Sequence, residues 1–338
     1  MKLKEFAEKV GLSPTTVSRA LGGYPEVRQE TRERVMEAAR KFGYRPNVNA
    51  VRLATGKAGA IGVVMGRSGN GYFFSEFMGG MASRLEGEDT DIVVSVTTDN
   101  DLNDELRIFS RLAASGRVDG IIIHSPRPDD ERIALLHKLG IPFIIHGRSD
   151  SKFEHAWLDI DNHAVTYLST VHLLERGHRN IAFINGPKGM TFVIDRENGY
   201  RDALATMDMA LDPRMVLSAP FSEETAFQFA RSLLEKASRP TAFVAGAMMT
   251  AQGVYRAASQ LGLTIGKDVS VIAHDDVFPY LTPESMLPSL STTRSPLRMA
   301  GERVTDLLLQ IIAGRPVDEC QELWPVDLVL RQSSGSAN

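Results

Sequence analysis

The spacing of hydrophobic residues changes near Ala60 and divides the chain in two. Before that point apolar residues recur at the spacing of amphipathic helices, and the predicted helices are Leu3–Val10, Pro14–Leu21 and Glu30–Phe42. Gly11 tolerates the positive φ that ends a helix, while Ser13 and Pro14 suit the cap and the first residue of the next helix. The inner face of the third helix is predicted to hold Val35, Ala38, Ala39 and Phe42. We therefore expect three short helices around a small core of their own.

From Ala60 onward, short β-rich apolar runs alternate with helical stretches. The predicted strands are Ala60–Met65, Asp91–Val96, Gly120–His124, Phe143–His146, Ile181–Ile184, Ala242–Ala245 and Val269–Ala273. The predicted helices are Phe74–Leu85, Asp104–Ser115, Val165–Arg176, Arg196–Met207, Glu223–Lys236 and Met248–Leu261. This alternation is typical of parallel sheets that are covered by helices on both faces. We predict an all-α head followed by an α/β body of two doubly wound parallel-sheet lobes.

The composition excludes several classes of protein. With 43% hydrophobic and 24% charged residues, the 338-residue chain is neither disordered nor fibrous. Its single cysteine, Cys320, cannot form an internal disulfide or a cysteine zinc site. The first residues lack the apolar core of a signal peptide, and no run approaches the roughly 20 apolar residues of a membrane span. We therefore expect a cytoplasmic protein with no membrane association, no metal and no cofactor.

The two parts differ in charge. Residues 1–60 hold 12 Lys and Arg against 6 Glu, a net charge of +6, whereas the remainder holds 26 basic against 36 acidic residues, a net charge of −10. A basic head on an acidic body is suited to contact with a polyanion through the head. A solvated pair of charged helices would give the same charge.

The first two predicted helices and their glycine turn have the form of a helix-turn-helix, whose second helix enters the major groove of DNA. Thr15 can contact a base edge or a thymine methyl, and Arg19 can bind guanine through two parallel hydrogen bonds. The hydroxyls of Thr16 and Ser18 suit phosphates. The predicted DNA-binding residues of the head are Ser13, Pro14, Thr15, Thr16, Ser18 and Arg19. A structural or protein-binding module remains an alternative at this stage.

Motifs along the whole chain resemble those of the lactose-repressor (LacI/GalR) family of bacterial transcription factors. They include VGLSPTTVSRALGGYPEV and GYRPN in the head, and VDGIII, RGHRNIAFINGP, ENGYRDAL, DVSVIAHDD and STTRSPL in the body. The resemblance implies a homodimer that binds double-stranded operator DNA, with a small carbohydrate effector between the lobes of a periplasmic-binding-protein-like body. The effector is expected to be a mono- or disaccharide, and the similarity of the head to that of α-glucoside utilisation repressors makes an α-glucoside such as sucrose, maltose or trehalose the leading candidate.

The resemblance also implies the domain boundaries. A helix-turn-helix domain is expected at residues 1–46, a hinge helix at 47–57 and the body at 58–338. The first lobe is expected to comprise residues 58–158 and 291–321, and the second lobe 159–290 and 322–332. In the hinge, Leu53 is expected to insert between central base pairs while Asn47 and Ala50 face the floor of the minor groove. A plain linker is the alternative for this segment.

Ligands of open α/β sheets lie beyond the carboxyl ends of the strands. Polar residues at the predicted strand ends are His124, Ser125, His146, Arg148, Asn185, His274, Asp275 and Asp276. Sugars suit planar polar side chains together with an aromatic face, and the resemblance assigns the sugar-clamping arginine to Arg196 and the stacking ring to Phe221. The predicted effector-binding residues are Phe73, Phe74, His124, Arg148, Asp161, Arg196, Phe221 and Asp275. Phe73 and Phe74 could instead be core, Asp275 a helix cap and Arg196 an ion-pair partner.

One segment departs from the family pattern. Where relatives usually read A-N-D, this chain has Ala245, Gly246 and Ala247, so the Asn and Asp that often cap the next helix and touch the ligand are missing. The cleft is therefore expected to be roomier and less polar on this side, which would suit a larger or less hydroxylated effector.

No enzyme motif accompanies these features. The sequence has no GxxxxGKT/S, GxSxG or HExxH, and its eight histidines show no metal-ligand spacing. We expect a regulator rather than an enzyme, with a sugar-binding transport protein without a gene-regulatory role as the alternative. The polar tail RQSSGSAN has no leucine heptads, which favours a dimer over a tetramer.

Overall fold

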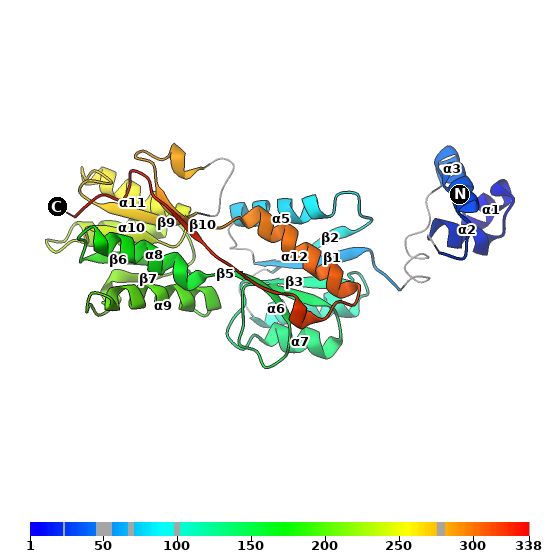
Figure 1. The fold of residues 1–338 in the computed structure, drawn as a ribbon, viewed down its shortest axis with the longest axis horizontal. Helices are drawn as coiled ribbons and strands as arrows, with labels where there is room; N and C mark the ends of the chain where they lie inside the picture. The colour runs from blue at the N-terminus through cyan, green and yellow to red at the C-terminus, as the bar shows by residue number, and fades with distance from the viewer. Residues whose placement is uncertain (23, 45–55, 67–70, 98–101, 276–280, 338) are drawn as a thin grey trace. The chain divides into compact units, whose positions relative to one another are not determined.

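The computed structural model describes residues 1–22, 24–44, 56–66, 71–97, 102–275 and 281–337 (Figure 1). The chain divides into two compact units, Met1–Gly59 and Ala60–Asn338. This division lies close to residue 58, where the sequence analysis places the start of the body. The hinge residues Asn47, Ala50 and Leu53 lie outside the described residues.

The head contains the three predicted helices, α1 (Leu3–Val10), α2 (Pro14–Leu21) and α3 (Gln29–Phe42). Gly11 ends α1 with φ +72°, and the Ser13 hydroxyl caps α2 by accepting the Thr16 N–H at 3.1 Å. Side chains from all three helices and the segment that follows form the core, whose buried members are Phe6, Ala7, Val17, Ala20, Val35, Ala39 and Tyr44. The head is thus a folded unit with its own hydrophobic core.

The prediction that Phe42 belongs to this core is wrong, because the residue is 43% exposed. The chain turns at Gly43, with φ +62°, and the Tyr44 N–H donates to the carbonyl of Ala39 at 2.9 Å. This is the hydrogen bond of a Schellman motif, which folds the residue after the glycine back over the helix. Tyr44 therefore fills the core and stacks on Phe6, with ring centroids 4.2 Å apart.

The first lobe of the body is a six-stranded parallel sheet in the order β11-β5-β4-β3-β1-β2. Its strands are β1 (Ala60–Gly66), β2 (Asp91–Thr97), β3 (Gly120–His124), β4 (Phe143–His146), β5 (Ala156–Ile160) and β11 (Gln321–Trp324). Successive residues of a strand point to opposite faces. One face packs on helices α5 (Gly71–Arg84) and α12 (Leu297–Ile312), and the other on α6 (Leu102–Ala114) and α7 (Glu131–Leu139).

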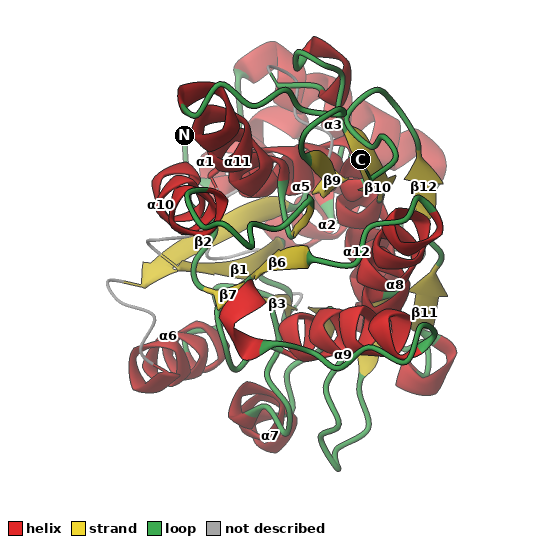
Figure 2. Ribbon diagram, turned by 90° about the vertical axis from the view of Figure 1, so that its left-hand side faces the viewer, coloured by secondary structure: helices red, strands yellow, loops and turns green. Residues whose placement is uncertain are grey.

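The second lobe is a six-stranded sheet in the order β12-β10-β9-β8-β6-β7. Its strands are β6 (Ile181–Asn185), β7 (Val216–Ser218), β8 (Ala242–Ala245), β9 (Ser270–Asp275), β10 (Ser291–Arg294) and β12 (Asp327–Val329). All these strands pair in parallel except β12, which is antiparallel to β10. Helices α8 (Asn162–Glu175) and α9 (Thr191–Ala205) cover one face, and α10 (Glu223–Leu234) and α11 (Met248–Gln260) the other. Figure 2 shows this layering of red helices against yellow strands.

The chain passes between the lobes three times, after Ile160, after Arg294 and after Trp324 (Figure 1). The predicted boundaries at 158, 290 and 321 are therefore too early. Strand β5 continues to Ile160, β10 pairs with β9 of the second lobe, and β11 pairs with β5 of the first lobe. A strand belongs to the sheet that satisfies its backbone hydrogen bonds, so each crossing comes only after its strand has ended.

Candidate functional site

The predicted reading helix of the head, α2, presents its polar residues to solvent. Pro14, Thr15, Ser18 and Arg19 are exposed, whereas Val17 and Ala20 of the same helix are buried in the core. Ser13 is exposed as well, but its hydroxyl caps α2, and it lies 2.8 Å from the hydroxyl of the half-buried Thr16. The side chains best placed to meet DNA are therefore Thr15, Ser18 and Arg19.

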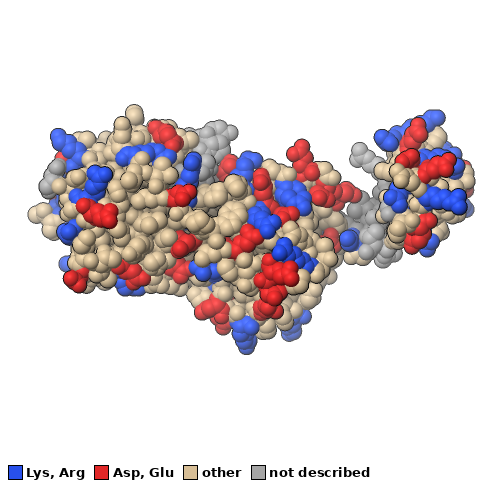
Figure 3. Space-filling model, in the orientation of Figure 1, with Lys and Arg blue, Asp and Glu red and all other residues tan. Residues whose placement is uncertain are grey.

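The basic residues of the head serve two purposes. Figure 3 shows Lys and Arg side chains over much of the visible face of the head, with acidic side chains between them. Two arginines of α3 also hold the fold: Arg32 donates to the carbonyl of Tyr24 at 2.9 Å and Arg34 to that of Val10 at 3.2 Å. Exposed cations such as Arg19 remain at the surface, where they can neutralise phosphates.

A cavity of about 250 Å³ lies between the two lobes of the body. The predicted effector-binding residues that line it are Phe73, Phe74, His124, Arg148, Arg196 and Phe221. Asp161 is not one of the lining residues; its carboxylate caps α8 by accepting the N–H of Ala164 at 2.9 Å. Asp275 is the last residue of β9 and pairs with Arg294 of β10. The structure describes its backbone but not its side chain. The structure thus brings most of the predicted set together.

The first-lobe wall of the cavity contains a cluster of closely packed aromatic rings. His124 ends β3 and His146 ends β4, and their Nδ1 atoms lie 3.0 Å apart, so one ring donates a proton that the other accepts. The Phe73 ring lies 4.6 Å from that of His124, and the Phe77 ring 4.7 Å from that of His146. Burial, and then the charges of His146 and Arg132, lower the pKa of His124 well below its usual value. The first-lobe lining thus combines these rings with the charged side chains of Glu105, Arg132, Arg148 and Asp159.

The second-lobe wall is built around Arg196, which is 5% exposed. Its Nε donates to the amide Oδ1 of Asn162 at 2.9 Å and its Nη1 to the carbonyl of Gly246 at 2.9 Å. The guanidinium carbon lies 5.0 Å from the centre of the Phe192 ring, one turn earlier in α9. Hydrogen bonds and a cation–π contact thus fix this arginine in one orientation.

The Gly246–Ala247 departure has a structural consequence that differs from the expected roomier cleft. A Cβ at Gly246 would lie 2.8 Å from Cε1 of Phe221 and 2.8 Å from the carbonyl oxygen of Ile184. The Phe221 ring therefore occupies space that a side chain at position 246 would need. At the start of α11, the Thr250 hydroxyl accepts the Ala247 N–H at 3.2 Å, but no side chain at position 247 caps the first N–H groups of the helix.

A chain of hydrogen bonds links residues on both sides of the first crossing between the lobes, which comes after Ile160. Arg148 Nε donates to Oδ2 of Asp159 at 3.0 Å, and Asn162 Nδ2 donates to Oδ1 of the same carboxylate at 3.1 Å. Burial raises the pKa of Asp159 to about 6, although the hydrogen bond and charge of Arg148 act to lower it. Arg148 also lies 3.7 Å from a carboxylate oxygen of Asp195 in α9. Arg148, on the first lobe, thus interacts with both lobes.

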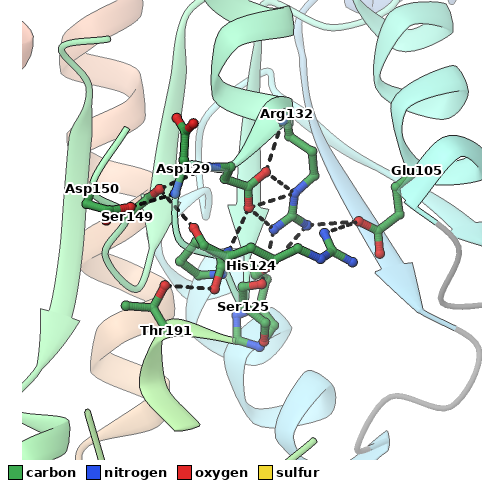
Figure 4. A network of polar contacts seen from close by, with 11 residues as sticks. Glu105, His124, Ser125, Asp129, Arg132, Ser149, Asp150 and Thr191 are labelled. Atoms are coloured by element: carbon green, nitrogen blue, oxygen red, sulfur yellow. Dashed lines mark hydrogen bonds and ion pairs between the residues drawn. The ribbon is translucent and has the colours of Figure 1, made fainter. Parts of the chain in front are cut away.

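The loop between β3 and α7 is held by a buried charge network (Figure 4). Arg132 contacts the Asp130 carboxylate at 2.6 Å and that of Glu105 at 3.3 Å, and it donates to the carbonyl of Ser125 at 3.0 Å. Arg127 pairs with Glu105 at 3.0 Å. Burial acts to raise the pKa of Asp130, but the bonds and charge of Arg132 outweigh it and lower the pKa. The network fixes the loop at one end of the cavity.

Sequence reasoning missed several residues of the cavity. Phe192 could have been found, because it lies four residues before Arg196 and so on the same helical face. Asn162 directly follows the predicted Asp161 and lines the cavity, whereas the Asp161 side chain caps α8. Trp324 ends β11, a strand that was not predicted, and its sequence gives no signal of its own.

Comparisons with known proteins agree across the whole chain. Residues 2–47 match the family described as bacterial regulatory proteins, lacI family, and residues 170–334 match a periplasmic binding protein-like domain. The HTH-type transcriptional regulator AglR of Rhizobium meliloti (strain 1021) is 43% identical over 341 residues, 100% of this chain and 95% of its own. The HTH-type transcriptional regulator RafR of Escherichia coli is 34% identical over 331 residues, 96% of each chain.

Solved structures are similar as well. The lac repressor dimer bound to operator and the anti-inducer ONPF has a TM-score of 0.85 at 27% identity, and the match covers 99% of each chain. A complex of the transcriptional regulator CelR with cellobiose has a TM-score of 0.72 at 26% identity and covers 98% of this chain and 99% of that one.

The fold and the two sites define a DNA-binding regulator whose α/β body encloses a ligand cavity. With whole-chain relatives above 30% identity, this chain belongs to the lacI family of bacterial regulatory proteins, as its motifs predicted. Within the described ranges, no helix combines the length and apolar character of a membrane span. The same ranges contain no group of three or more His, Cys, Asp or Glu side chains arranged to hold a metal ion.

Proposed function

We propose that the chain is a transcriptional repressor whose affinity for operator DNA is controlled by a small sugar bound between the lobes. One observation carries this proposal: the head exposes a reading helix with Thr15, Ser18 and Arg19, while the body encloses a cavity lined by aromatic rings and a fixed arginine, Arg196. A transport protein would have no use for the first feature, and a DNA-bending protein none for the second.

The proposed DNA complex is a homodimer on a pseudo-palindromic operator, with one head on each half-site. The lac repressor, which is 27% identical to this chain, was solved as a dimer bound to operator. In the major groove, Arg19 binds guanine and Thr15 contacts a neighbouring base, while Ser13, Pro14, Thr16 and Ser18 lie against the DNA backbone. In the minor groove, Leu53 inserts between base pairs, with Asn47 and Ala50 on the groove floor.

The chemistry of the cavity suits a carbohydrate. Sugars have polar hydroxyl edges and apolar C–H faces, so they need planar hydrogen-bonding groups and aromatic surfaces in one site. Arg196 and Arg148 provide donors, and Phe221, Phe192 and Phe73 provide faces on both lobes. We propose a disaccharide, with an α-glucoside such as sucrose, maltose or trehalose as the leading class. The complex of CelR with cellobiose, another disaccharide, supports this size of ligand.

The proposed mechanism is allosteric. A sugar that bridges the two lobes changes the angle between them and thus the separation of the two hinge segments in the dimer. Such coupling is typically about 1–3 kcal/mol, and thermodynamic linkage makes it reciprocal. The operator must therefore change the affinity for the sugar by the same factor by which the sugar changes the affinity for the operator.

The test uses the full-length protein and an operator enriched from a pool of randomised duplexes. The affinity for the enriched duplex is measured with and without sucrose, maltose and trehalose, and the affinity for the effective sugar is measured with and without the duplex. We expect about a fivefold change or more, equal in both directions. If no duplex is enriched over bulk competitor, the proposal is wrong for DNA; if none of a full panel of mono- and disaccharides changes duplex affinity, it is wrong for the effector.

A further inference from the structure

Two hydrogen bonds join the lobes directly at the rim of the cavity, and both come from one residue. Thr191, the first residue of α9 in the second lobe, donates its backbone N–H to the carbonyl of Pro126 at 3.0 Å and its hydroxyl to the same oxygen at 3.1 Å (Figure 4). Pro126 belongs to the first lobe and lines the cavity. The contact lies on the same helix as Arg196.

The acceptor is held in place by its own lobe. Pro126 follows Ser125, whose φ of +48° is uncommon for a residue other than glycine. The Arg132 guanidinium fixes this turn by donating to the Ser125 carbonyl. On the other side lies Gly147, with φ +116°, where a Cβ would come within 2.5 Å of Cδ of Pro126. A strained turn, a buried charge network and an obligatory glycine thus all place one carbonyl oxygen.

The backbone N–H of Thr191 has no hydrogen-bond acceptor within its own helix. The first N–H groups of an α-helix have no intrahelical acceptor and need one from elsewhere. For Thr191 that acceptor is supplied by the opposite lobe. One turn further along α9, Asp195 faces Arg148 of the first lobe at 3.7 Å. The first two turns of α9 therefore contact the first lobe through both Thr191 and Asp195.

We propose that Thr191 is a positioning residue of the effector site: its two hydrogen bonds to Pro126 hold α9, and with it Arg196 and Phe192, against the first-lobe wall of the cavity. The proposal rests on the proposed function in taking this cavity as the sugar site. Without the Thr191 contact, the two walls separate. Part of the binding free energy of a sugar that touches both walls is then used to close the lobes.

A graded series of variants isolates the two bonds. Thr191→Ser keeps both donors, Thr191→Val keeps the backbone donor, and Thr191→Pro removes both. Proline is well tolerated at the first position of a helix, and Met190 has the extended backbone, φ −95° and ψ 141°, that a residue before proline prefers. The proline ring would also lie where the Pro126 oxygen now lies, so the lobes must move apart. Thr191→Pro should therefore fold normally while it opens the contact.

The first readout needs no ligand. Both tryptophans of the chain lie in strands next to the lobe boundary, Trp157 in β5 beside Arg148 and Trp324 at the cavity. We expect Thr191→Pro to shift tryptophan emission to the red and to increase the radius of gyration in small-angle scattering, whereas Thr191→Ser matches the wild type. Equal emission and scattering for all variants would overturn the proposal, as would equal changes in Thr191→Ser and Thr191→Pro.

The second readout is the affinity of the full-length protein for sucrose, maltose and trehalose. Loss of two hydrogen bonds predicts roughly tenfold to hundredfold weaker binding in Thr191→Pro, with Thr191→Val between it and the wild type. Thermal unfolding serves as control, because a purely structural role would lower the melting temperature and leave affinity unchanged. That outcome overturns the proposal. If the wild type binds none of these sugars, the proposed effector fails while the ligand-free readout still decides the role of Thr191.

Discussion

Arg196 and Asn162 share a hydrogen bond of 2.9 Å between the guanidinium Nε and the amide Oδ1. The amide nitrogen of Asn162 donates in turn to Asp159, whose other oxygen accepts from Arg148. Arg196 and Arg148, two of the arginines that line the cavity, are therefore connected through the first crossing between the lobes. Because the amide must present its oxygen to a guanidinium and its nitrogen to a carboxylate, its orientation is fixed.

Replacement of Arg196 should separate sugar response from DNA binding. Arg196→Ala removes the charged donor that is held ready in the second-lobe wall, and we expect sugar affinity to fall roughly tenfold to hundredfold. Operator affinity in the absence of sugar should stay at the wild-type level, because the head is a separate folded unit. Titration of the operator complex with sugar measures both. A variant that responds at the wild-type sugar concentration would show that the assigned site is wrong.

Gly246→Ala tests whether the position of the Phe221 ring requires that residue 246 has no side chain. The new Cβ would meet the Phe221 ring and the Ile184 carbonyl, both at 2.8 Å. Overpacking of this kind typically costs about 1–3 kcal/mol of unfolding free energy, and displacement of the ring should also weaken sugar binding. The double variant with Phe221→Leu is the control. If the ring is the main obstacle, the cost of Gly246→Ala is smaller in the Phe221→Leu background; equal costs would contradict this account.

The periodic elements were predictable because their own residues carry the signal. The apolar runs of β1, β3, β4 and β8 and the caps of α1 and α2 lie where the sequence pattern places them. By contrast, β10 (STTR) and β11 (QELW) have no apolar run, and they are strands because partners far along the chain bind them. Helices α7 and α12 were also not predicted, although both have apolar faces.

The cavity was predictable by residue type and resemblance, but its internal contacts were not. Arg196 and Phe221 could be assigned from motifs, whereas the positions of Asn162 and Thr191 become meaningful only when two lobes meet. Such contacts depend on tertiary structure, and no local pattern encodes them. The fit of Phe221 against Gly246 likewise depends on the distance between two strand ends.

Arg132→Leu should destabilise the body strongly. Arg132 is 4% exposed, and its loss leaves the fully buried Asp130 carboxylate without its cation. Removal of one partner of a buried ion pair typically costs about 3–5 kcal/mol. Arg107→Leu is a matched control, because the exposed Arg107 pairs with Asp104 at the surface, and such pairs contribute about 1 kcal/mol or less. Urea unfolding of both variants measures the difference, and similar losses would contradict the assigned role of the network.

Two variants distinguish base reading from wedge insertion in the proposed DNA complex. Arg19→Lys keeps the charge of an exposed residue of α2 but loses the planar fork, so discrimination at one base pair should fall by about 1–3 kcal/mol while non-specific binding changes little. Leu53→Ala should weaken binding to every specific site more than non-specific binding, because the bend is lost. Competition assays against single-base operator variants measure both effects. Equal loss of specific and non-specific binding in Leu53→Ala would remove the wedge.

The stability of the body should depend on pH through Asp159. Burial raises the pKa of this carboxyl to about 6 in the folded protein, whereas an unfolded Asp titrates near about 3.9. As the pH falls from 7 to 5, the folded protein takes up a proton that the unfolded chain does not, so the contribution of Asp159 to stability rises by roughly 1 kcal/mol. Burial lowers the pKa of His124, so this residue makes the folded protein less stable as the pH falls. An Asp159→Asn variant retains His124, so this contribution cancels when the variant is compared with the wild type. The unfolding free energy of the variant relative to the wild type should therefore fall by that amount between pH 7 and pH 5. Urea unfolding at half-unit pH steps measures it, and parallel pH profiles for the two proteins would show that Asp159 does not titrate in this range.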